Sequence, residues 1–361
     1  MLGVRPFRCD DIPQVADLHR RVMRIGDPTS ELLAEYRDYL VDVYLENPWR
    51  QGGIEALVYE EQGGRIVAFF GVTPRRISAG GAIFTAAVGS NFCVEPTRRG
   101  LVGIKVLDEF LRGPQDLSLA DEANNISRQL WERLGGSTAL LYSMRWSLPL
   151  RPMRLGLWLL ARRKRLAPLA GLLGPLAGLG DTLLARLPIG PYRSSTPDAE
   201  GEELDCNAFM ACLCEMLPPR QLRPQYDSRS FGWLVERAAR MRTQGELHKI
   251  AVKAGGNLVG CYLYYSKPGG LSQVLQIAAR DGHADRVLNH LAHHAYEHGA
   301  IAICGRLEPS FIQALCQHHC LFDAYPLWVL THSRHPNLLA AFEQGTARLS
   351  RLDGEWCQHF Q

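Results

Sequence analysis

The sequence predicts an α/β protein with mixed sheets, parallel and antiparallel in part, arranged as two similar modules in tandem. Segments with strand-like and helix-like apolar spacing alternate along the chain, and one order of segments occurs twice. The chain has 361 residues, of which 46% are hydrophobic, so it can bury more than one core.

The first half alternates strands and helices around one hairpin. Gly63 and Gly64 separate two apolar runs, which is typical of a hairpin turn. Asn47 and Pro48 end the second helix, and Gly135 and Gly136 end the last one. Strands are expected at 4–8, 54–60, 65–72, 83–94, 116–120 and 138–145, and helices at 12–23, 30–46, 100–111 and 125–134.

The second half repeats the order hairpin, strand, helix, strand, helix, which indicates an internal duplication. Its elements are expected at 247–252, 258–266, 274–278, 284–298, 300–304 and 309–318. We therefore expect a first module over 1–150, a connector over 151–199 and a second module over 200–361. The turn at 278–285 carries Asp281 and Asp285, whose charges would repel phosphate, so the second module is expected to be degenerate.

The connector is rich in leucine, proline and glycine and carries a basic run at 162–165. Two interpretations remain open for 151–190: a peripheral contact with the inner face of a membrane, or a segment docked on the two modules. The formal charge of +3, from 40 basic and 37 acidic side chains, argues against a nucleic-acid partner. The N-terminus lacks a basic stretch followed by an apolar one, so a cytoplasmic location is expected.

Residues 91–104 run from a strand through a proline turn at Pro96 into a helix. A helix start exposes unpaired N–H groups and the positive end of the helix dipole, and Arg98 and Arg99 add charge. Gly100 and Gly103 let the backbone approach a ligand closely. The stretch is therefore a candidate phosphate cradle, although an ordinary strand-to-helix turn has the same pattern.

This stretch resembles the cofactor-binding region of the GNAT acyltransferase superfamily, in which a strand ending in Val-x-Pro precedes a glycine-containing loop. The resemblance implies acetyl-CoA, or another acyl-CoA, as co-substrate. The family glycines fall on Val102 and Ile104 in one alignment and on Leu101 and Gly103 in another. The residues implied to contact the pantetheine arm or the pyrophosphate are Cys93, Val94, Arg98, Arg99, Gly100, Leu101, Val102, Gly103 and Ile104.

A second segment, 124–135, resembles the family's Asn-x-x-Ala-x-x-Leu-Tyr-Glu-Lys-Leu-Gly sequence. The resemblance places Asn124 against the cofactor arm and Ser127 close to it. Trp131 stands where many members have a tyrosine that protonates the leaving thiolate, a step that an indole N–H cannot perform.

No catalytic residue follows from the sequence. Tyr142 and Ser143, on the next expected strand, are the nearest replacements for the missing acid. Glu95 is a candidate base, and a solvated surface charge is the competing interpretation.

Histidines recur at helical spacing at His290, His294 and His298. Such spacing can chelate a divalent ion, but the apolar stripe of the same helix puts these histidines on its outward side, so no metal is expected. Cys316 and Cys320 lack the second cysteine pair that a zinc site requires.

The resemblance implies transfer of a short acyl group from acyl-CoA to an amine on a small molecule or peptide, by direct attack. The alternative is a non-catalytic acyl-CoA-binding protein with a regulatory or scaffolding role.

Overall fold

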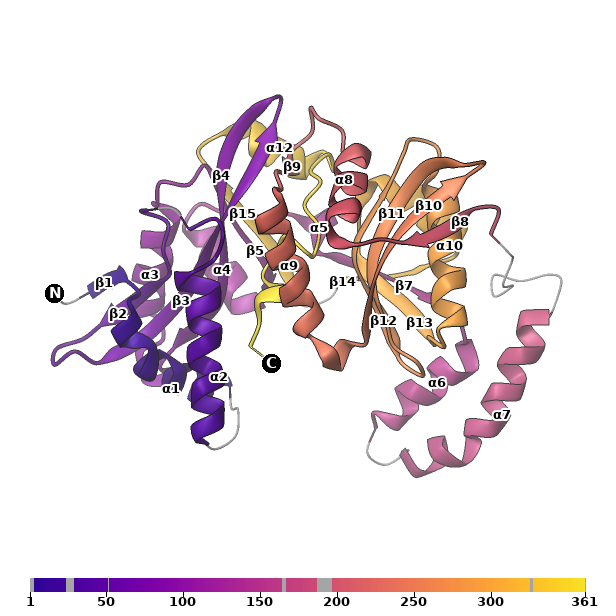
Figure 1. Cartoon of the computed structure of the whole chain (residues 1–361). Helices are drawn as coiled ribbons and strands as arrows, with labels where there is room; N and C mark the ends of the chain where they lie inside the picture. The colour runs from indigo at the N-terminus through magenta and orange to yellow at the C-terminus, as the bar shows by residue number, and fades with distance from the viewer. Residues whose placement is uncertain are drawn as a thin grey trace. The chain divides into compact units, whose positions relative to one another are not determined.

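The computed structural model describes residues 3–23, 29–50, 52–163, 167–186, 197–324 and 327–360 (Figure 1). The chain forms two compact units. The first contains Met1–Ser143, Pro219–Arg237 and Pro326–Gln361, and the second contains Met144–Pro218 and Ala238–Tyr325. These units are not the continuous modules expected from the sequence, because residues 144–149 pair in the sheet of the second unit, and residues 223–224 and 328–333 pair in the sheet of the first.

The first unit contains an 8-stranded sheet. The pairing of β4 with β5 is parallel and the other pairings are antiparallel. The strand order is β1 (Gly3–Pro6), β2 (Leu57–Glu60), β3 (Ile66–Ala79), β4 (Ala82–Val94), β5 (Leu117–Ala123), β15 (Trp328–Ser333) and β6 (Ser137–Thr138), with β9 (Arg223–Pro224) paired to β3.

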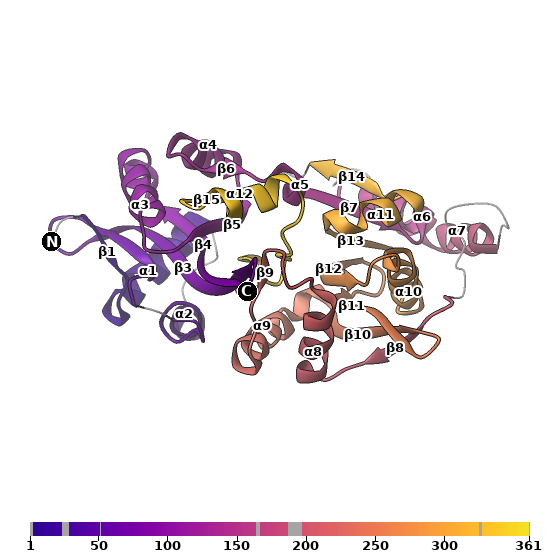
Figure 2. The ribbon, with the colours of Figure 1, turned by 90° about the horizontal axis from the view of Figure 1, so that it is seen from above.

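Helices cover both faces of this sheet (Figure 2). On one face α1 (Ile12–Met23) and α2 (Ser30–Leu40) enclose a core that includes Val15 and Phe69. On the other face α3 (Leu101–Leu111) and α4 (Asn125–Arg133) enclose a core that includes Val106 and Trp131. The remaining helices associated with this unit are α5 (Leu140–Ser143), α9 (Ser228–Arg240), which extends past the unit boundary, and α12 (Pro336–Glu343).

The segment 138–145 is not the expected last strand of the first sheet. Residues Leu140–Ser143 form the short helix α5, and the chain then enters β7 (Met144–Pro149), which pairs with strands of the second sheet. The place beside β5 is taken by β15, about 200 residues later in the chain.

The second unit contains a 7-stranded sheet with a parallel pairing of β12 with β13. Its helix α10 (Ala284–Glu297) packs on the face of Tyr262 and Tyr264, and α8 (Cys206–Met216) packs on the face of Cys261. The strand order is β14 (Leu321–Ala324), β7, β13 (Ala302–Arg306), β12 (Leu271–Ala279), β11 (Asn257–Ser266), β10 (Glu246–Ala254) and β8 (Glu200–Glu203), and α11 (Ile312–Gln317) completes the unit. The order β10, β11, β12, α10, β13, α11 repeats β2, β3, β4, α3, β5, α4.

The histidines of α10 do not lie on its outward side. His290 is buried, and its Nδ1 lies 2.8 Å from the Tyr262 hydroxyl oxygen. His294 Nδ1 lies 2.7 Å from the Tyr264 hydroxyl oxygen. The polar edge of α10 therefore faces two tyrosines of β11, which give the imidazoles hydrogen bonds at the border of the apolar core.

The connector contains two helices, α6 (Pro152–Ala161) and α7 (Ala167–Arg186), which pack on each other. Asp181 of α7 accepts hydrogen bonds from the first-turn amides of Met153 and Arg154 in α6, at 2.8 and 3.1 Å. Lys164 and Arg165 of the basic run lie outside the described residues. No helix in the described part of the chain is long and apolar enough to cross a membrane.

Candidate active site

The parallel strands β4 and β5 diverge in the middle of the first sheet. Their pairing joins residues 86–88 to residues 117–119. Beyond that point β4 continues for six residues to Val94 and β5 for four to Ala123, with no further pairing between them among the described residues. A cavity of about 400 Å³ lies at this opening, and residues 89–92 of β4 form part of its wall.

The N-terminus of α3 presents backbone amides without partners. The first helical bond runs from the Ile104 amide to the Gly100 carbonyl oxygen, at 3.0 Å. Within the described chain, no acceptor lies within hydrogen-bonding distance of the amides of residues 100–103. Gly100 has φ 106° and ψ −105°, a conformation that other residues adopt only under strain. The Ile104 amide is therefore excluded from the predicted cradle, and the available donors are those of residues 100–103.

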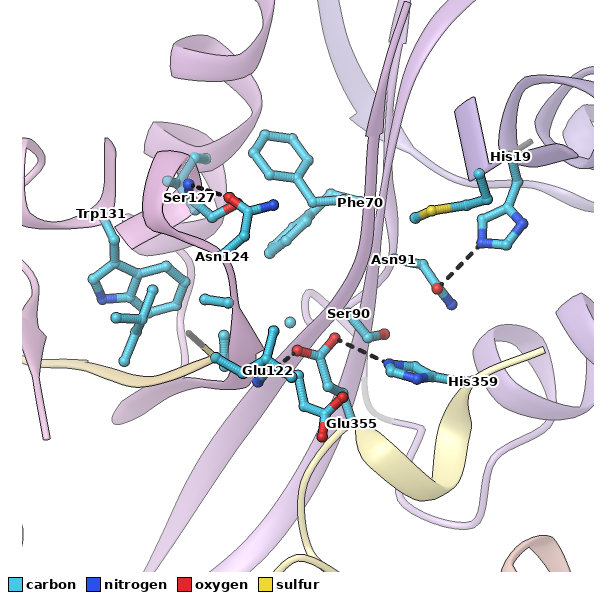
Figure 3. Close-up of a pocket in the computed structure, with 18 of the residues that line it drawn as sticks. His19, Phe70, Ser90, Asn91, Glu122, Asn124, Ser127, Trp131, Glu355 and His359 are labelled. Carbon is cyan, nitrogen blue, oxygen red and sulfur yellow. Dashed lines mark hydrogen bonds and ion pairs between the residues drawn. The ribbon is translucent and has the colours of Figure 1, made fainter. Parts of the chain in front are cut away.

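Asn124 and Ser127 lie on the cavity wall opposite β4 (Figure 3). The Asn124 side-chain oxygen accepts from the amides of Ile126 and Ser127, at 3.0 Å each, and so caps α4. This capping fixes the start of α4 beside the open edge of β4.

No protein-family model matches the chain, and no curated protein matches it. Many solved structures are similar to the chain, among them the following three. One from Enterococcus faecalis V583, described as a probable N-acyltransferase, has a TM-score of 0.57 and 10% identity, covering 91% of this chain and 71% of that one. A GCN5-related N-acetyltransferase from Anabaena variabilis ATCC 29413 has a TM-score of 0.56 and 11% identity, covering 91% of this chain and 71% of that one. A GCN5-related N-acetyltransferase from Kribbella flavida has a TM-score of 0.52 and 13% identity, covering 91% of this chain and 70% of that one. The chain has the GNAT fold.

The GNAT fold of the first unit contains a bulge in β4 at the cavity. Pairing with β3 shifts between Phe69 and Gly71, so that β4 has an extra residue there. Asn91 has φ 48°, a left-handed conformation that asparagine tolerates better than most residues. The bulge breaks the strand's side-chain alternation and allows Asn91 and Phe92 both to line the cavity.

A buried polar network holds the bulge in place. Asn91 Oδ1 lies 3.2 Å from His19 Nε2, and Asn91 Nδ2 donates to the hydroxyl oxygens of Tyr39 and Tyr44, at 2.7 Å in the case of Tyr44. His19 Nδ1 lies 3.0 Å from the Tyr36 hydroxyl oxygen. Burial lowers the pKa of His19 and outweighs its hydrogen bond with Asn91, which acts in the opposite direction. At neutral pH the His19 ring on the cavity wall is therefore uncharged.

Acidic side chains line another part of the cavity, beside the end of β5. The Glu355 Oε1 atom accepts from the Glu122 amide at 3.0 Å, and Glu122 pairs with Arg351 at 2.7 Å. Burial raises the pKa of Glu355, and the nearby Asp121 and Glu122 add to this effect. His359 Nε2 lies 3.9 Å from Glu355 Oε2.

The pKa of His359 is shifted in the opposite direction from the pKa of His19. Burial by itself would lower the pKa of His359, but its ion pair with Glu355 and the nearby carboxylates of Glu122 and Asp121 outweigh burial and raise it. The cavity wall thus holds an uncharged imidazole at His19 and a carboxylate–imidazole pair at Glu355 and His359 (Figure 3).

Several predicted cofactor contacts lie away from this cavity. The Cys93 side chain is fully buried on the α1 and α2 face, where burial raises the pKa of its thiol to about 12. Val94 packs on the α3 face. Arg98 pairs with Glu61 at 2.7 Å, and Arg99 is exposed. Cys93 and Val94 are not among the residues that line the cavity, and neither is any residue of 98–104.

The candidate catalytic residues have structural roles. The Tyr142 hydroxyl donates to the Ala347 carbonyl oxygen at 2.8 Å, and the Ser143 hydroxyl bonds the backbone of Ala139 and Val329, both at 2.9 Å. Neither residue lines the cavity.

Glu95 is buried rather than a solvated charge. It forms ion pairs with Arg21 at 2.9 Å and Arg65 at 3.4 Å. It also lies outside the cavity lining. The Trp131 indole lines the cavity, but its N–H donates to the Thr331 carbonyl oxygen at 3.0 Å.

The site residues expected from the sequence did not include His19, Glu122, Glu355 or His359. For His19 a signal existed, because it falls on the apolar stripe of α1 with Val15 and is buried there. Glu355 and His359 come from a C-terminal segment more than 230 residues from β5, and no local pattern relates the two.

Proposed function

We propose that the first unit binds an acyl-CoA between β4 and β5 and transfers its acyl group to an amine. The observation that carries this proposal is the divergence of β4 from β5 after residues 88 and 119, together with the unpartnered amides at the start of the helix that follows β4. The GNAT fold favours this reaction but does not by itself establish it.

The groups around the opening suit the parts of an acyl-CoA. The pyrophosphate would accept hydrogen bonds from the amides of residues 100–103, with Arg99 adding positive charge. The pantetheine arm would lie along the edge of β4 that β5 leaves open, with Asn124 and Ser127 on the opposite wall. In this arrangement Cys93 and Val94 contribute backbone, since their side chains pack into the two cores.

The acidic part of the wall suits an amine. Glu122 and Glu355 would attract and orient the protonated acceptor. His19 is uncharged, and its Nε2–H donates to Asn91 Oδ1 at 3.2 Å, a contact that an entering amine can replace. When that contact is lost, the tautomer in which Nδ1–H donates to the Tyr36 hydroxyl leaves the lone pair on Nε2, and this nitrogen can then accept a proton. We assign His19 the role of proton acceptor.

The reaction would then be a direct displacement. The amine nitrogen, having lost a proton to His19, attacks the thioester carbonyl carbon and forms the C–N bond. The C–S bond breaks, and the second proton of the amine nitrogen passes to the departing CoA thiolate. His19 returns the first proton to solvent. Positioning of the two substrates supplies most of the rate enhancement.

The test is formation of free CoA from acetyl-CoA over a panel of amines, measured by chromatography because exposed cysteines such as Cys9 and Cys214 would react with thiol reagents. We expect amine-dependent CoA release that falls by roughly 100-fold in His19→Gln, the scale of general-base catalysis. Tight binding of acetyl-CoA must persist in that variant. Absence of acetyl-CoA binding by the wild-type chain would end the proposal.

One observation favours a non-catalytic acyl-CoA-binding protein as the second candidate. The Trp131 N–H is committed to Thr331, and in the described part of the chain no tyrosine lines the cavity to protonate a thiolate. Binding of acetyl-CoA without amine-dependent release of CoA would select this alternative.

A further inference from the structure

Three histidines of the second unit converge in space. His248 lies on β10, His294 lies on α10, and His298 caps the C-terminus of α10. One ring nitrogen from each lies within 4.8 Å of the others. In the described part of the chain, this is the one group of three or more His, Cys, Asp or Glu side chains with that geometry.

Each of the three rings has a polar partner at Nδ1. His298 Nδ1 donates to the His294 carbonyl oxygen at 2.8 Å, and His294 Nδ1 lies 2.7 Å from the Tyr264 hydroxyl oxygen. His248 Nδ1 lies 3.3 Å from Glu203 Oε2. Metal-binding histidines are held in this way, because a partner at one nitrogen fixes the ring and leaves the lone pair of the other nitrogen for the metal.

The Nε2 atoms remain for a ligand. In His294 and His298 they have no hydrogen-bond partner within the described residues. His248 Nε2 lies 3.0 Å from the Ser266 hydroxyl oxygen, a neutral contact that rotation of the hydroxyl can release. Glu246 Oε2, 3.9 Å from the same nitrogen, is exposed and close enough to reach a fourth position.

The three rings also lie close to one another. His294 and His298 stack with ring centroids 4.2 Å apart, and His248 lies 4.9 Å from His298. This arrangement brings several imidazole nitrogens close together, where one cation can accept a lone pair from each.

We propose that His248, His294 and His298 bind one Zn²⁺ ion through their Nε2 atoms, with a carboxylate or water as the fourth ligand. Imidazole is a preferred ligand for zinc, with Zn–N distances of about 2.0–2.1 Å. A tetrahedral ion then needs nitrogens about 3.3 Å apart, a separation that modest side-chain rotation reaches from the present one. The ion would join strand β10 to the end of α10.

No metal was expected from the sequence, because only the spacing of the histidines along α10 could be seen there. That spacing supplies His294 and His298, whereas the third ligand comes from a strand some 46 residues earlier and the partners Tyr264 and Glu203 come from two further strands. The site is independent of acyl-CoA, since the residues involved all belong to the second unit.

The test uses the full chain without an affinity tag, treated with a chelator and dialysed. Calorimetric titration with Zn²⁺ should give one equivalent bound, and Co²⁺ should give the visible absorption of a tetrahedral complex. His298→Gln and His248→Gln should each weaken binding by roughly 100-fold or more, the upper end of the effect of losing even a supporting residue. Circular dichroism checks that each variant is folded. If only one of the two variants folds, that variant alone is enough to test the site.

The matched control is His319→Asn. His319 is exposed, has φ 54°, which asparagine tolerates, and lies beside the Cys316 and Cys320 pair. The His319→Asn variant should bind Zn²⁺ as the wild type does. No Zn²⁺ binding by the wild-type chain, or affinity lost in His319→Asn and kept in the other two variants, would overturn the proposal.

Discussion

Reversing the charge of Arg99 should weaken acyl-CoA binding without changing the fold. Arg99 directly precedes Gly100 and the unpartnered amides of residues 100–103, and its side chain is exposed. In Arg99→Glu the pyrophosphate would meet a carboxylate at the place where the α3 dipole and a guanidinium now act together.

The size of the effect follows from the exposure of Arg99. An exposed ion pair contributes about 0.5–1 kcal/mol, so reversal of the charge should cost about 1–2 kcal/mol of binding free energy. This corresponds to a Kd for acetyl-CoA that is roughly 5–30 times higher. The loss should shrink as salt is added, because exposed charges are screened within about 10 Å at 0.1 M salt.

Isothermal titration calorimetry with acetyl-CoA measures this Kd. Arg112→Glu is the matched control, because Arg112 lies at the opposite end of the same helix and makes an equal change in net charge. Equal affinities for the Arg99→Glu variant and the wild type, or equal losses in the two variants, would refute the reasoning that places the pyrophosphate at the start of α3.

Gly100→Ala should unfold at a lower temperature and bind acetyl-CoA more weakly, because an alanine at φ 106° costs about 1–3 kcal/mol and displaces the first turn of α3; Gly156→Ala in α6, where the added Cβ meets open space, should bind acetyl-CoA as the wild type does and unfold at the same or a slightly higher temperature, because alanine favours a helix more than glycine does. If His19 is the base, kcat/KM should rise with pH through a pKa below about 6.5 and level off above it, because only the uncharged ring can accept the proton. If the His19→Gln variant shows the same rise, the pKa belongs to another group. Trp131→Phe should lower the free energy of unfolding by about 1–3 kcal/mol through loss of the bond to Thr331 and keep the rate of CoA release per folded molecule; a large fall in that rate would show that the indole takes part in the reaction. If 151–190 contacts membranes, the chain should sediment with vesicles of acidic lipid, and serine at the exposed Leu176, Leu179 and Leu183 on one face of α7 should reduce the bound fraction; no sedimentation would favour the docked connector.

Local chemistry made much of the first unit predictable. Most of the expected helices and strands up to residue 134 correspond to those observed, because apolar spacing and the turn residues at 63–64 and 135–136 act over short distances. Two bounds were wrong: β3 continues to Ala79 rather than to 72, and α2 ends at Leu40 rather than at 46. Asn124 was expected against the cofactor arm, and the structure shows that it also caps α4, a role that its place directly before α4 explains. The glycine that the α3 start requires is Gly100, by its positive φ, and not a residue at 102 or 104.

What the sequence did not reveal depends on contacts far apart in the chain. Tyr142 and Ser143 were expected on a strand of the first sheet, but β15 occupies that place, and apolar spacing cannot show which strand pairs with β5. Glu355 and His359 reach the cavity for the same reason, since the C-terminal segment belongs to the first unit. The two interpretations of Glu95 differed in whether its carboxylate is solvated. The structure decides this through Arg21 on α1, an ion-pair partner that no local pattern relates to Glu95.

Hydrogen exchange with and without acetyl-CoA tests the central claim most directly. The amides of residues 100–103 have no acceptor in the described chain and should exchange rapidly in the free protein. Acetyl-CoA should slow their exchange, together with that of residues 89–94 on the open edge of β4. Unchanged exchange in both segments at a concentration of acetyl-CoA that saturates binding would contradict the claim that the opening between β4 and β5 holds the cofactor.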